Sequence, residues 1–302
     1  MKVKFKENEK NQYVTLELTD MEGKKFEAEL HAYIWGLLAS IKLRIDNGWH
    51  GVLIITGDVG DGKSSLAALI TAVWEKMQNR QVGYNNIVWR TLKFIELTDL
   101  KDNFGHAIWW DEAIDGATGK ASITKEGTKL KNAMVTKRLK RHLYVLLIDE
   151  IEEYSWKFVK MCNAWIHVKA FGIQRGYFNA YVKRHKIRQI YTEFKKNKKD
   201  WDSFEIKKIR PDCRGKYGYY FDRFFDTDEY DNKKIDETRQ IEESQQESKG
   251  SNRGAKITKE MMEAKKLNEG GTSVKDIAMK YNVNPKTVYN WFDKIKAVGI
   301  VI

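Results

Sequence analysis

Apolar and polar residues alternate through the first part of the chain, residues 1–29. The segments KVKFKE, YVTLEL and KKFEAEL each place every second side chain on one face, and Met21, Glu22 and Gly23 lie near a turn. A period of two is typical of half-buried strands. The pattern predicts an amino-terminal β-hairpin. The helical spacing of apolar residues over 31–45 predicts a helix after it.

Continuous apolar runs follow, separated by helical patterns. Short runs that are apolar throughout indicate strands buried on both faces. Such strands alternating with helices predict an α/β fold with a mainly parallel sheet flanked by helices. The predicted strands are 51–56, 86–91, 106–113, 143–148 and 164–171, and the predicted helices are 64–78 and a basic one at 125–142.

The chain changes character after the predicted sheet. Residues 183–216 hold 13 Lys or Arg and 5 Asp or Glu. The next segment is almost purely polar, and its Ser-, Gln- and Gly-rich second part predicts a flexible linker. Apolar periodicity returns at Ile257. We therefore expect a hairpin and helix over 1–48, an α/β domain with a basic extension over 49–227, a charged helix and linker over 228–256, and a small all-α domain over 257–302.

The composition of the chain indicates what kind of partner it binds and in which cellular compartment it works. Lys plus Arg is 54 against 42 for Asp plus Glu, which gives a net charge of +12 and favours a polyanionic partner. The two cysteines show no metal-ligand spacing and suit a reducing cytosol. No apolar run approaches the ~20 residues that span a bilayer. We expect a cytoplasmic protein without a membrane segment, in the host cytoplasm if it is viral.

The stretch GDVGDGKS, residues 57–64, fits the phosphate-binding P-loop pattern G-x-x-x-x-G-K-[ST] between a predicted strand and a predicted helix. Glycines permit backbone angles that turn amides toward phosphate, and the helix amino terminus adds its positive dipole end. Lys63 is expected to reach the β- and γ-phosphates of ATP, and Ser64 to offer its hydroxyl to Mg²⁺. The expected nucleotide-binding residues are Gly57, Asp58, Val59, Gly60, Asp61, Gly62, Lys63, Ser64 and Ser65. Asp58 and Asp61 would place negative charge beside bound phosphate. We therefore expect their side chains to face solvent or to cap the loop.

A P-loop ATPase also needs an acidic residue at a strand end for the Mg²⁺ shell. Asp111–Glu112 and Asp149–Glu150 both follow apolar strands. The first pair fits the chain order better, because one helix and one strand candidate separate it from Lys63. We assign Asp111 to the metal and Glu112 to polarising the attacking water. The second pair remains an alternative, since acidic residues also suit the first turn of a helix.

The order of the P-loop, WWDEA, a basic helix, RHLYVLLI and AWIHVKAFG resembles the FtsK/HerA-type branch of P-loop ATPases. It resembles most the small ATPases that viruses and mobile elements use as DNA motors. The resemblance covers roughly residues 50–182. It implies a homo-oligomer, often a hexameric ring, with an arginine acting on the neighbouring subunit's nucleotide. Arg138 and Arg141 are the candidates for that arginine, and a solvated or DNA-facing helix is the alternative.

The resemblance has one departure. It places the strand 143–148 where additional-strand ATPases carry a polar sensor residue, usually an amide or hydroxyl. Here the strand ends in Asp149, which leaves the sensor role open.

The segment 273–295 has the pattern of a helix-turn-helix. Ser273 with Asp276 forms a capping box, Asn282 tolerates a left-handed turn, and Asn284 with Pro285 begins a second helix. The segment resembles the trihelical DNA-binding domains of resolvases and transposases. That resemblance places four side chains in the major groove: Lys286, Thr287, Tyr289 and Asn290. A helical protein-binding module is the alternative.

The basic region 183–216 also interleaves aromatic residues with its charges: Tyr191, Phe194, Trp201 and Phe204. This composition suits a nucleic-acid contact. The equal alternative is a solvated face whose aromatic rings lie in the core.

Together these patterns predict a DNA-stimulated ATPase that uses ATP and Mg²⁺ and binds DNA, expected to be double-stranded. The leading hypothesis is a translocase or packaging motor. The alternatives are an ATP-switched loader or regulator for replication, transposition or segregation, and a DNA-binding regulator that only senses nucleotide.

Overall fold

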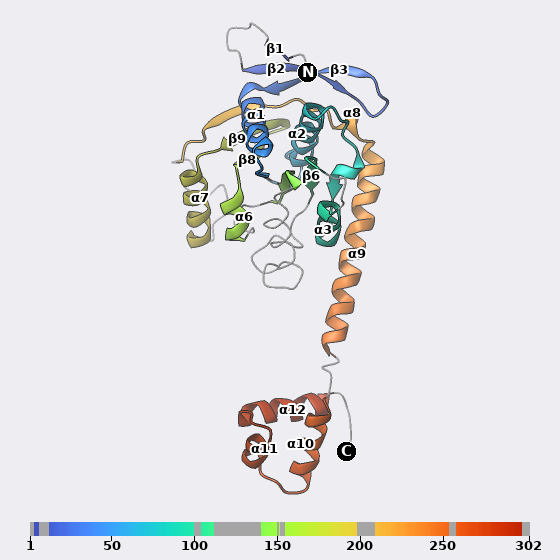
Figure 1. The fold of residues 1–302 in the computed structure, drawn as a ribbon, viewed down its shortest axis with the longest axis vertical. Helices are drawn as coiled ribbons and strands as arrows, with labels where there is room; N and C mark the ends of the chain where they lie inside the picture. Colours follow the sequence, from blue (N-terminus) through green and yellow to red (C-terminus); the bar gives the residue numbers. More distant parts are fainter. Residues whose placement is uncertain are drawn as a thin grey trace. The chain divides into compact units, whose positions relative to one another are not determined.

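The computed structural model describes residues 3–5, 12–99, 104–111, 140–149, 151, 155–197, 209–253 and 258–297. The chain forms two compact units, Met1–Glu237 and Thr238–Ile302. Figure 1 shows the elements of each unit. Among the described residues, no helix is both long and apolar enough to cross a lipid bilayer.

The first unit is built on a seven-stranded sheet with the order β10-β9-β8-β4-β7-β6-β5. Strands β8, β4, β7, β6 and β5 run parallel, which confirms the mainly parallel sheet expected from the sequence. Two antiparallel strands that the sequence analysis did not anticipate, β9 and β10, extend one edge. The strands are β4 Gly51–Thr56, β5 Ile87–Val88, β6 Ala107–Trp110, β7 Leu143–Leu147, β8 Ala164–Phe171, β9 Gln174–Tyr181 and β10 Cys213–Lys216.

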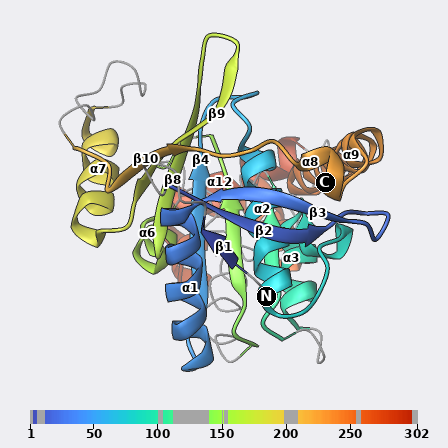
Figure 2. The ribbon, with the colours of Figure 1, turned by 90° about the horizontal axis from the view of Figure 1, so that it is seen from above.

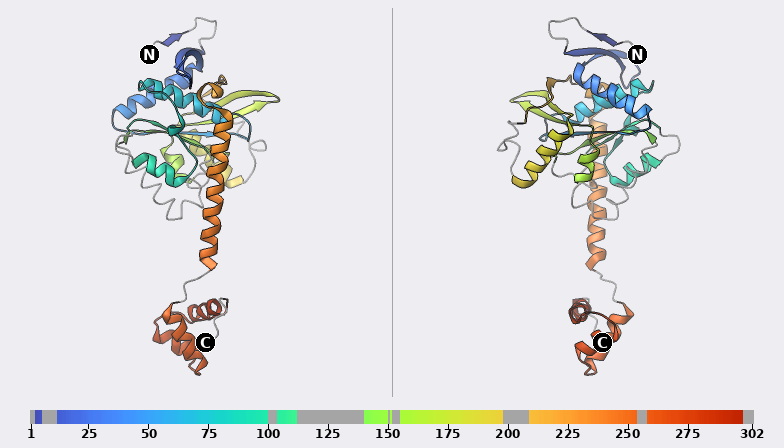
Figure 3. Two further views of the ribbon diagram at one scale, coloured as in Figure 1. Left: turned by 90° about the vertical axis from the view of Figure 1, so that its right-hand side faces the viewer. Right: turned by 60° about the vertical axis from the view of Figure 1, so that its left-hand side comes forward.

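Helices cover both faces of this sheet (Figures 1 and 3). Side chains of β4 alternate between the two cores, with Leu53 and Ile55 on one face and Val52 and Ile54 on the other. Burial on both faces explains why the central strands are apolar throughout. One face carries α1 Ala32–Asp46 and α2 Lys63–Met77, and the other carries α3 Thr91–Asp99, α6 Trp156–Met161 and α7 Arg184–Asn197.

A small antiparallel sheet lies over α1 and α2 (Figure 2). Its strands are β1 Val3–Phe5, β2 Tyr13–Thr19 and β3 Lys25–His31. The alternating residues Val14, Leu16 and Leu18 are fully or almost fully buried in the core shared with the two helices. The predicted hairpin is confirmed as β2–β3, and β1 adds a third strand.

The basic helix α7 buries its aromatic residues. Ile187, Ile190, Tyr191 and Phe194 belong to the second core, and Tyr191 stacks on Trp156 with ring centroids 5.1 Å apart. For Tyr191 and Phe194, the structure therefore supports the alternative of a solvated basic face over core aromatics. Trp201 and Phe204 lie outside the described residues.

The chain then passes through the short helix α8 Phe221–Phe224 into a long helix, α9 Thr227–Arg253. The first turns of α9, up to Glu237, belong to the first unit. Helix also occupies most of the segment for which a flexible linker was expected. The segment contains no proline and is rich in Glu, Gln, Lys and Arg, which have high helix propensity.

The second unit is all-α, as expected, with α10 Lys259–Glu269, α11 Val274–Lys280 and α12 Pro285–Ala297. Its buried core consists of Ala264, Ile277, Ala278 and Val288. Two predicted local features are present. The Ser273 side chain caps α11, and Asn282 adopts the left-handed region with φ 50° in the turn before α12.

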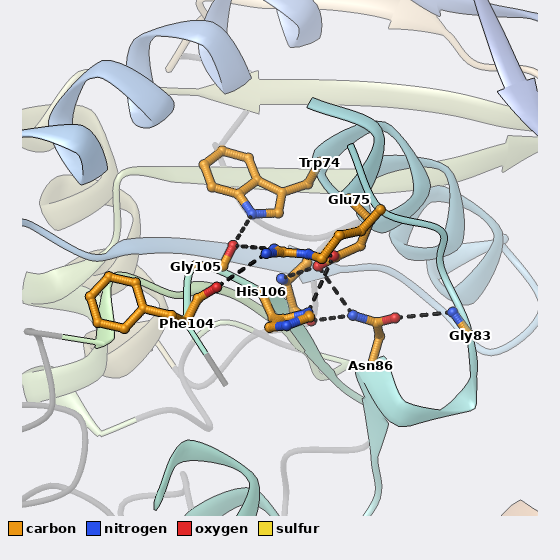
Figure 4. Close-up of polar contacts among 9 residues, drawn as sticks. Trp74, Glu75, Gly83, Asn86, Phe104, Gly105 and His106 are labelled. Carbon is orange, nitrogen blue, oxygen red and sulfur yellow. Dashed lines mark hydrogen bonds and ion pairs between the residues drawn. The ribbon is translucent and has the colours of Figure 1, made fainter. Parts of the chain in front are cut away.

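A buried carboxylate ties the end of α2 to the start of β6 (Figure 4). The Glu75 side chain is fully buried. It accepts hydrogen bonds from Arg80 Nε at 2.5 Å and from the backbone N of Ala107 at 2.6 Å, and His106 Nδ1 lies 3.3 Å away. Asn86 Nδ2 donates a further bond at 3.2 Å. Burial by itself would raise the pKa of Glu75, but hydrogen bonds from His106 and Arg80 outweigh it and hold that pKa below the ordinary 4.5.

We expect Glu75→Gln to lower the free energy of unfolding by about 3 kcal/mol, because it removes the fully buried carboxylate that accepts from Arg80 and from the backbone N of Ala107. Urea denaturation measures this. A lowered folded-state pKa adds stability above the unfolded value near 4.5 and loses it as the pH falls. The difference between wild type and variant should therefore be full above that pH and shrink below it. The matched control is Glu22→Gln, which removes an exposed pair with Lys24 and should change stability little. Equal effects of the two substitutions would contradict the assignment.

Candidate functional site

The register of the parallel strands brings three chain segments to one edge of the sheet. Ile55 of β4 lies opposite Leu147 of β7, and Trp110 of β6 lies opposite Leu146. The residues that follow these strands, Gly57, Asp149 and Asp111, therefore share the carboxyl edge. In open α/β sheets this edge is where ligands bind. Strand β7 lies between β4 and β6 in the sheet.

The glycine-rich turn after β4 has the backbone that a P-loop requires. Gly57 has φ 148° and Gly62, the residue that caps the start of α2, has φ 100°. A Cβ on Gly57 would lie 2.5 Å from the carbonyl oxygen of Val168. A Cβ on Gly62 would lie 2.2 Å from the hydroxyl of Tyr219. Only glycine fits at these two positions.

The loop's two acidic residues meet the condition set by the sequence analysis. Asp61 caps the loop, since its Oδ2 accepts from the backbone N of Asp58 at 3.2 Å. Asp58 itself is exposed. Tyr217 closes the loop from outside, because its hydroxyl donates to the carbonyl oxygen of Gly62 at 3.0 Å.

A cavity of about 380 Å³ opens in front of this loop. Cationic, hydroxyl and carboxylate groups converge there from the loop and from five other parts of the chain. The lining residues are Asp58, Val59, Gly60, Gly62, Lys63, Ser64, Ser65, Asp111, Leu147, Ile148, Asp149, Arg175, Tyr219 and Lys234.

The Lys63 ammonium group donates to two carbonyl oxygens of its own loop and to one carboxylate from another strand end. Its Nζ donates to the carbonyl oxygen of Gly57 at 2.6 Å, to that of Asp58 at 3.2 Å and to Asp149 Oδ1 at 2.6 Å. Its side chain is 15% exposed and that of Asp149 is 47% exposed. The ammonium group therefore has a carboxylate partner in the place where a P-loop lysine meets phosphate. Phosphate must displace Asp149 from Lys63.

Asp111 is the buried carboxylate of the site, with 2% of its surface exposed. Its Oδ1 accepts from Ser64 Oγ at 3.5 Å. Its Oδ2 accepts from the Tyr230 hydroxyl and lies 3.4 Å from Lys234 Nζ. The structure thus places the two expected metal-binding side chains, Ser64 and Asp111, next to one another.

This pair suits a magnesium nucleotide. Mg²⁺ in such sites binds one or two protein oxygens and completes its shell with water and phosphate oxygens. The described residues accordingly contain no group of three or more His, Cys, Asp or Glu that would hold a metal ion without a nucleotide. A hydroxyl and a carboxylate beside a phosphate cradle fit that chemistry.

A buried polar group supports the end of β4 below the loop. The Thr56 hydroxyl accepts from Trp165 Nε1 at 2.8 Å and lies 3.0 Å from His167 Nδ1. Burial, with smaller contributions from Lys169 and Lys63, lowers the pKa of His167 to about 3. His167 is therefore neutral at physiological pH and can accept the hydroxyl proton of Thr56.

The structure places only some of the predicted catalytic residues. Glu112, Arg138 and the alternative Glu150 lie outside the described residues. Arg141 is described, and it precedes the amino end of β7 with its guanidinium 5.6 Å from the ring centroid of Phe104. This is the opposite edge of the sheet from the P-loop of the same chain. A role for Arg141 toward nucleotide would have to be in another subunit's site, and it stays a prediction.

Four residues of the site were not found by sequence reasoning: Arg175, Tyr219, Tyr230 and Lys234. The first two come from β9 and from the loop after β10, and the other two from α9. No local motif marks them. A tyrosine and a lysine spaced four apart in α9 place both side chains on one helix face, but the sequence does not say what that face contacts.

In the second unit, three of the four predicted DNA-contacting residues are exposed. Lys286, Tyr289 and Asn290 lie on the outer side of α12, and Thr287 is half-buried. Asn284 fixes the start of this helix, because its Oδ1 accepts from the backbone N of Lys286 at 2.9 Å. The exposed face carries the polar groups that a contact with nucleic acid requires.

No protein-family model matches the chain, and no curated protein sequence matches it. Among solved structures it is similar to the N-terminal domain of zonular occludens toxin from Neisseria meningitidis, with 11% identity and a TM-score of 0.44, over 59% of this chain and 100% of that one. It is also similar to the genome packaging NTPase B204 from Sulfolobus turreted icosahedral virus 2, solved with ATP-gammaS. That likeness has 12% identity and a TM-score of 0.33, over 44% of this chain and 93% of that one.

We expect Asp149→Asn to raise the affinity for ATP by up to about fivefold, because phosphate no longer has to break the ion pair with Lys63. The exposure of Asp149 limits the gain. Isothermal titration calorimetry with Mg²⁺ and a non-hydrolysable ATP analogue measures it. Asp58→Asn is the control for plain loss of negative charge beside the loop, and it keeps the backbone carbonyl oxygen that accepts from Lys63. An equal gain in both variants would argue against competition at Lys63.

Proposed function

We propose that this protein hydrolyses ATP and uses it to act on DNA, as a translocase or packaging motor of a virus or mobile element. The observation that carries the proposal is the convergence of the P-loop and the buried Asp111 on one cavity, with one strand between their two strands. This arrangement supplies a phosphate cradle and a metal-binding carboxylate at one edge of a rigid sheet.

In this proposal each group has one role. Lys63 leaves Asp149 and binds the β- and γ-phosphates, and Ser64 and Asp111 hold Mg²⁺. The bound metal neutralises the charge that develops on the transferred phosphoryl group. Glu112, directly after Asp111 in the sequence, takes a proton from the attacking water.

The DNA-binding part of the proposal is supported by charge and by the second unit. The chain carries a net charge of +12. Helix α7 exposes three basic side chains on its outer face: Arg184, Arg188 and Lys195. Helix α12 exposes Lys286, Tyr289 and Asn290. The first set suits backbone phosphates, and the second suits base edges. We further propose that the protein works as a homo-oligomeric ring in which Arg138 or Arg141 acts on a neighbouring subunit's nucleotide.

One observation favours a second candidate, an ATP-switched loader or regulator. Tyr230 and Lys234 of α9 contact Asp111, so binding of metal and nucleotide changes the contacts of the helix that continues toward the second unit. A switch would use that change without movement along DNA. Displacement of a triplex-forming strand by the protein with ATP would identify a motor, whereas ATP-dependent DNA binding without displacement would identify a switch.

We expect Lys63→Ala to abolish ATP hydrolysis, because the β/γ-phosphates lose their main side-chain partner. Glu112→Gln should retain ATP binding and lose turnover, because an amide cannot accept the proton of the attacking water. Phosphate release, with and without DNA, and nucleotide titration measure the two steps. Normal turnover in Glu112→Gln together with loss in Glu150→Gln would move the catalytic role to the second acidic pair.

We expect a chain ending at Arg253 to keep basal ATPase activity and lose sequence-selective DNA binding, because the second unit has its own core. Residual binding through the basic surface of the first unit should weaken steeply with salt.

In the full chain, Asn290→Ala or Lys286→Ala should cost roughly 1–3 kcal/mol of selectivity per lost base contact. DNA affinity over a salt series measures this, with Lys275→Ala on exposed α11 as a control. Identical DNA binding by the full and shortened chains would make the second unit a protein-docking module.

A further inference from the structure

The buried carboxylate of Asp111 needs a cation. Burying an unpaired carboxylate is costly, and Asp111 is only 2% exposed. The ammonium group of Lys63 is bonded to Asp149 at 2.6 Å. Lys234 Nζ lies 3.4 Å from Asp111 Oδ2 and so supplies a positive charge at the candidate metal site.

The position of Lys234 is fixed by the packing of α9. Tyr230, one turn earlier, is buried with its ring stacked on Trp109 at a centroid distance of 5.8 Å. Its ring also contacts Phe221 at 4.9 Å. Farther along the helix, Glu237 pairs with Arg90. These contacts anchor the first turns of α9 on both sides of Lys234, so the lysine is part of the nucleotide cavity.

The two oxygens of Asp111 have different neighbours. Oδ1 faces Ser64, the residue expected to bind Mg²⁺, and Oδ2 faces Lys234. In P-loop enzymes the metal bridges β- and γ-phosphate oxygens. A cation beside the metal-binding carboxylate is therefore close to the bridged phosphate oxygens, and Lys234 lines the same cavity as Lys63.

We propose that Lys234 is a phosphate-binding residue supplied by the same chain, which neutralises Asp111 before nucleotide binds and contacts the γ-phosphate afterwards. With Mg²⁺ bound by Ser64 and Asp111, the ammonium group of Lys234 would turn from Asp111 Oδ2 to the terminal phosphate. This inference rests on the proposed nucleotide-binding function. It assigns to α9 a role inside the site that no sequence motif indicates.

The neighbouring lysine provides a matched control. Lys233 lies on the same helix and pairs with Glu229, and its Nζ lies 4.4 Å from the ring centroid of Tyr84. It does not line the cavity. Lys233→Met and Lys234→Met remove the same charge from adjacent positions and keep most of the side-chain volume.

The test compares two nucleotides in the full-length protein. Calorimetric titrations with Mg²⁺ give the affinity for ADP and for the β,γ-imido analogue of ATP, which differ by the terminal phosphate. Lys234→Met should weaken analogue binding by about tenfold or more and change ADP binding by less than about twofold. Lys234→Arg should restore most of the analogue affinity, because it returns a cation, and Lys233→Met should match wild type.

The outcomes separate the inference from the proposed function. If wild type binds both nucleotides and Lys234→Met weakens both equally, Lys234 only supports the fold and the inference is wrong. The inference is also wrong if Lys234→Met leaves the ratio of the analogue affinity to the ADP affinity at its wild-type value. If wild type binds neither nucleotide, the proposed function fails and the inference with it. Thermal unfolding of each variant identifies one that has lost its fold. If Lys234→Met does not fold, Lys234→Arg decides: an analogue-to-ADP affinity ratio within about twofold of wild type supports the inference, and a ratio lower by about tenfold overturns it.

Discussion

The parallel register of β4, β7 and β6 is the constraint on which the site depends. It brings the ends of three strands, far apart in the sequence, to one edge of the sheet. Because both faces of the sheet are buried under helices, a slip in this register would have to repack two cores. The sheet therefore positions the P-loop, Asp111 and Asp149 rigidly, and the loops need only supply the chemistry.

Charge balance explains the detailed arrangement within that frame. Two of the cationic residues that line the cavity, Lys63 and Lys234, are each paired with a carboxylate: Asp149 for the first and Asp111 for the second. The site thus balances its own charges internally, which lowers the cost of holding them in a partly buried cavity. A magnesium nucleotide brings both a cation for the carboxylates and anions for the lysines. In the proposed mechanism, binding would exchange these partners, and the exchange would change the contacts that Tyr230 and Lys234 of α9 make with Asp111.

The position of α9 gives the fold a property that the domain pattern does not suggest. A helix that looks like a polar connection has its first turns anchored in the aromatic cluster of Trp109, Phe221 and Tyr230. A movement of Asp111 would change its hydrogen bond with Tyr230, which packs in this cluster.

The sequence by itself determined the elements whose signals are local. Apolar runs located β4 and β8 with their observed bounds, the GDVGDGKS pattern located the phosphate cradle, and Asn282 marked a left-handed turn that the structure contains. These features depend on residues close together in the chain, and short-range sterics and periodicity specify them. The assignment of Asp111 over Asp149 also used only chain order, and it stays a prediction although Asp111 lies next to Ser64.

Only the tertiary structure decided which distant side chains meet. It added β9 and β10, whose mixed polar sequences give a weak strand signal, and it placed Tyr191 and Phe194 in the core. It also brought Arg175, Tyr219 and Lys234 to the cavity and paired Lys63 with Asp149. These contacts span tens of residues or more in the chain and arise from the packing of α9 and the sheet edge against the strand ends. Periodicity and spacing in the sequence do not predict these contacts. They indicate which face of a helix or strand is buried, but not which other element packs against that face.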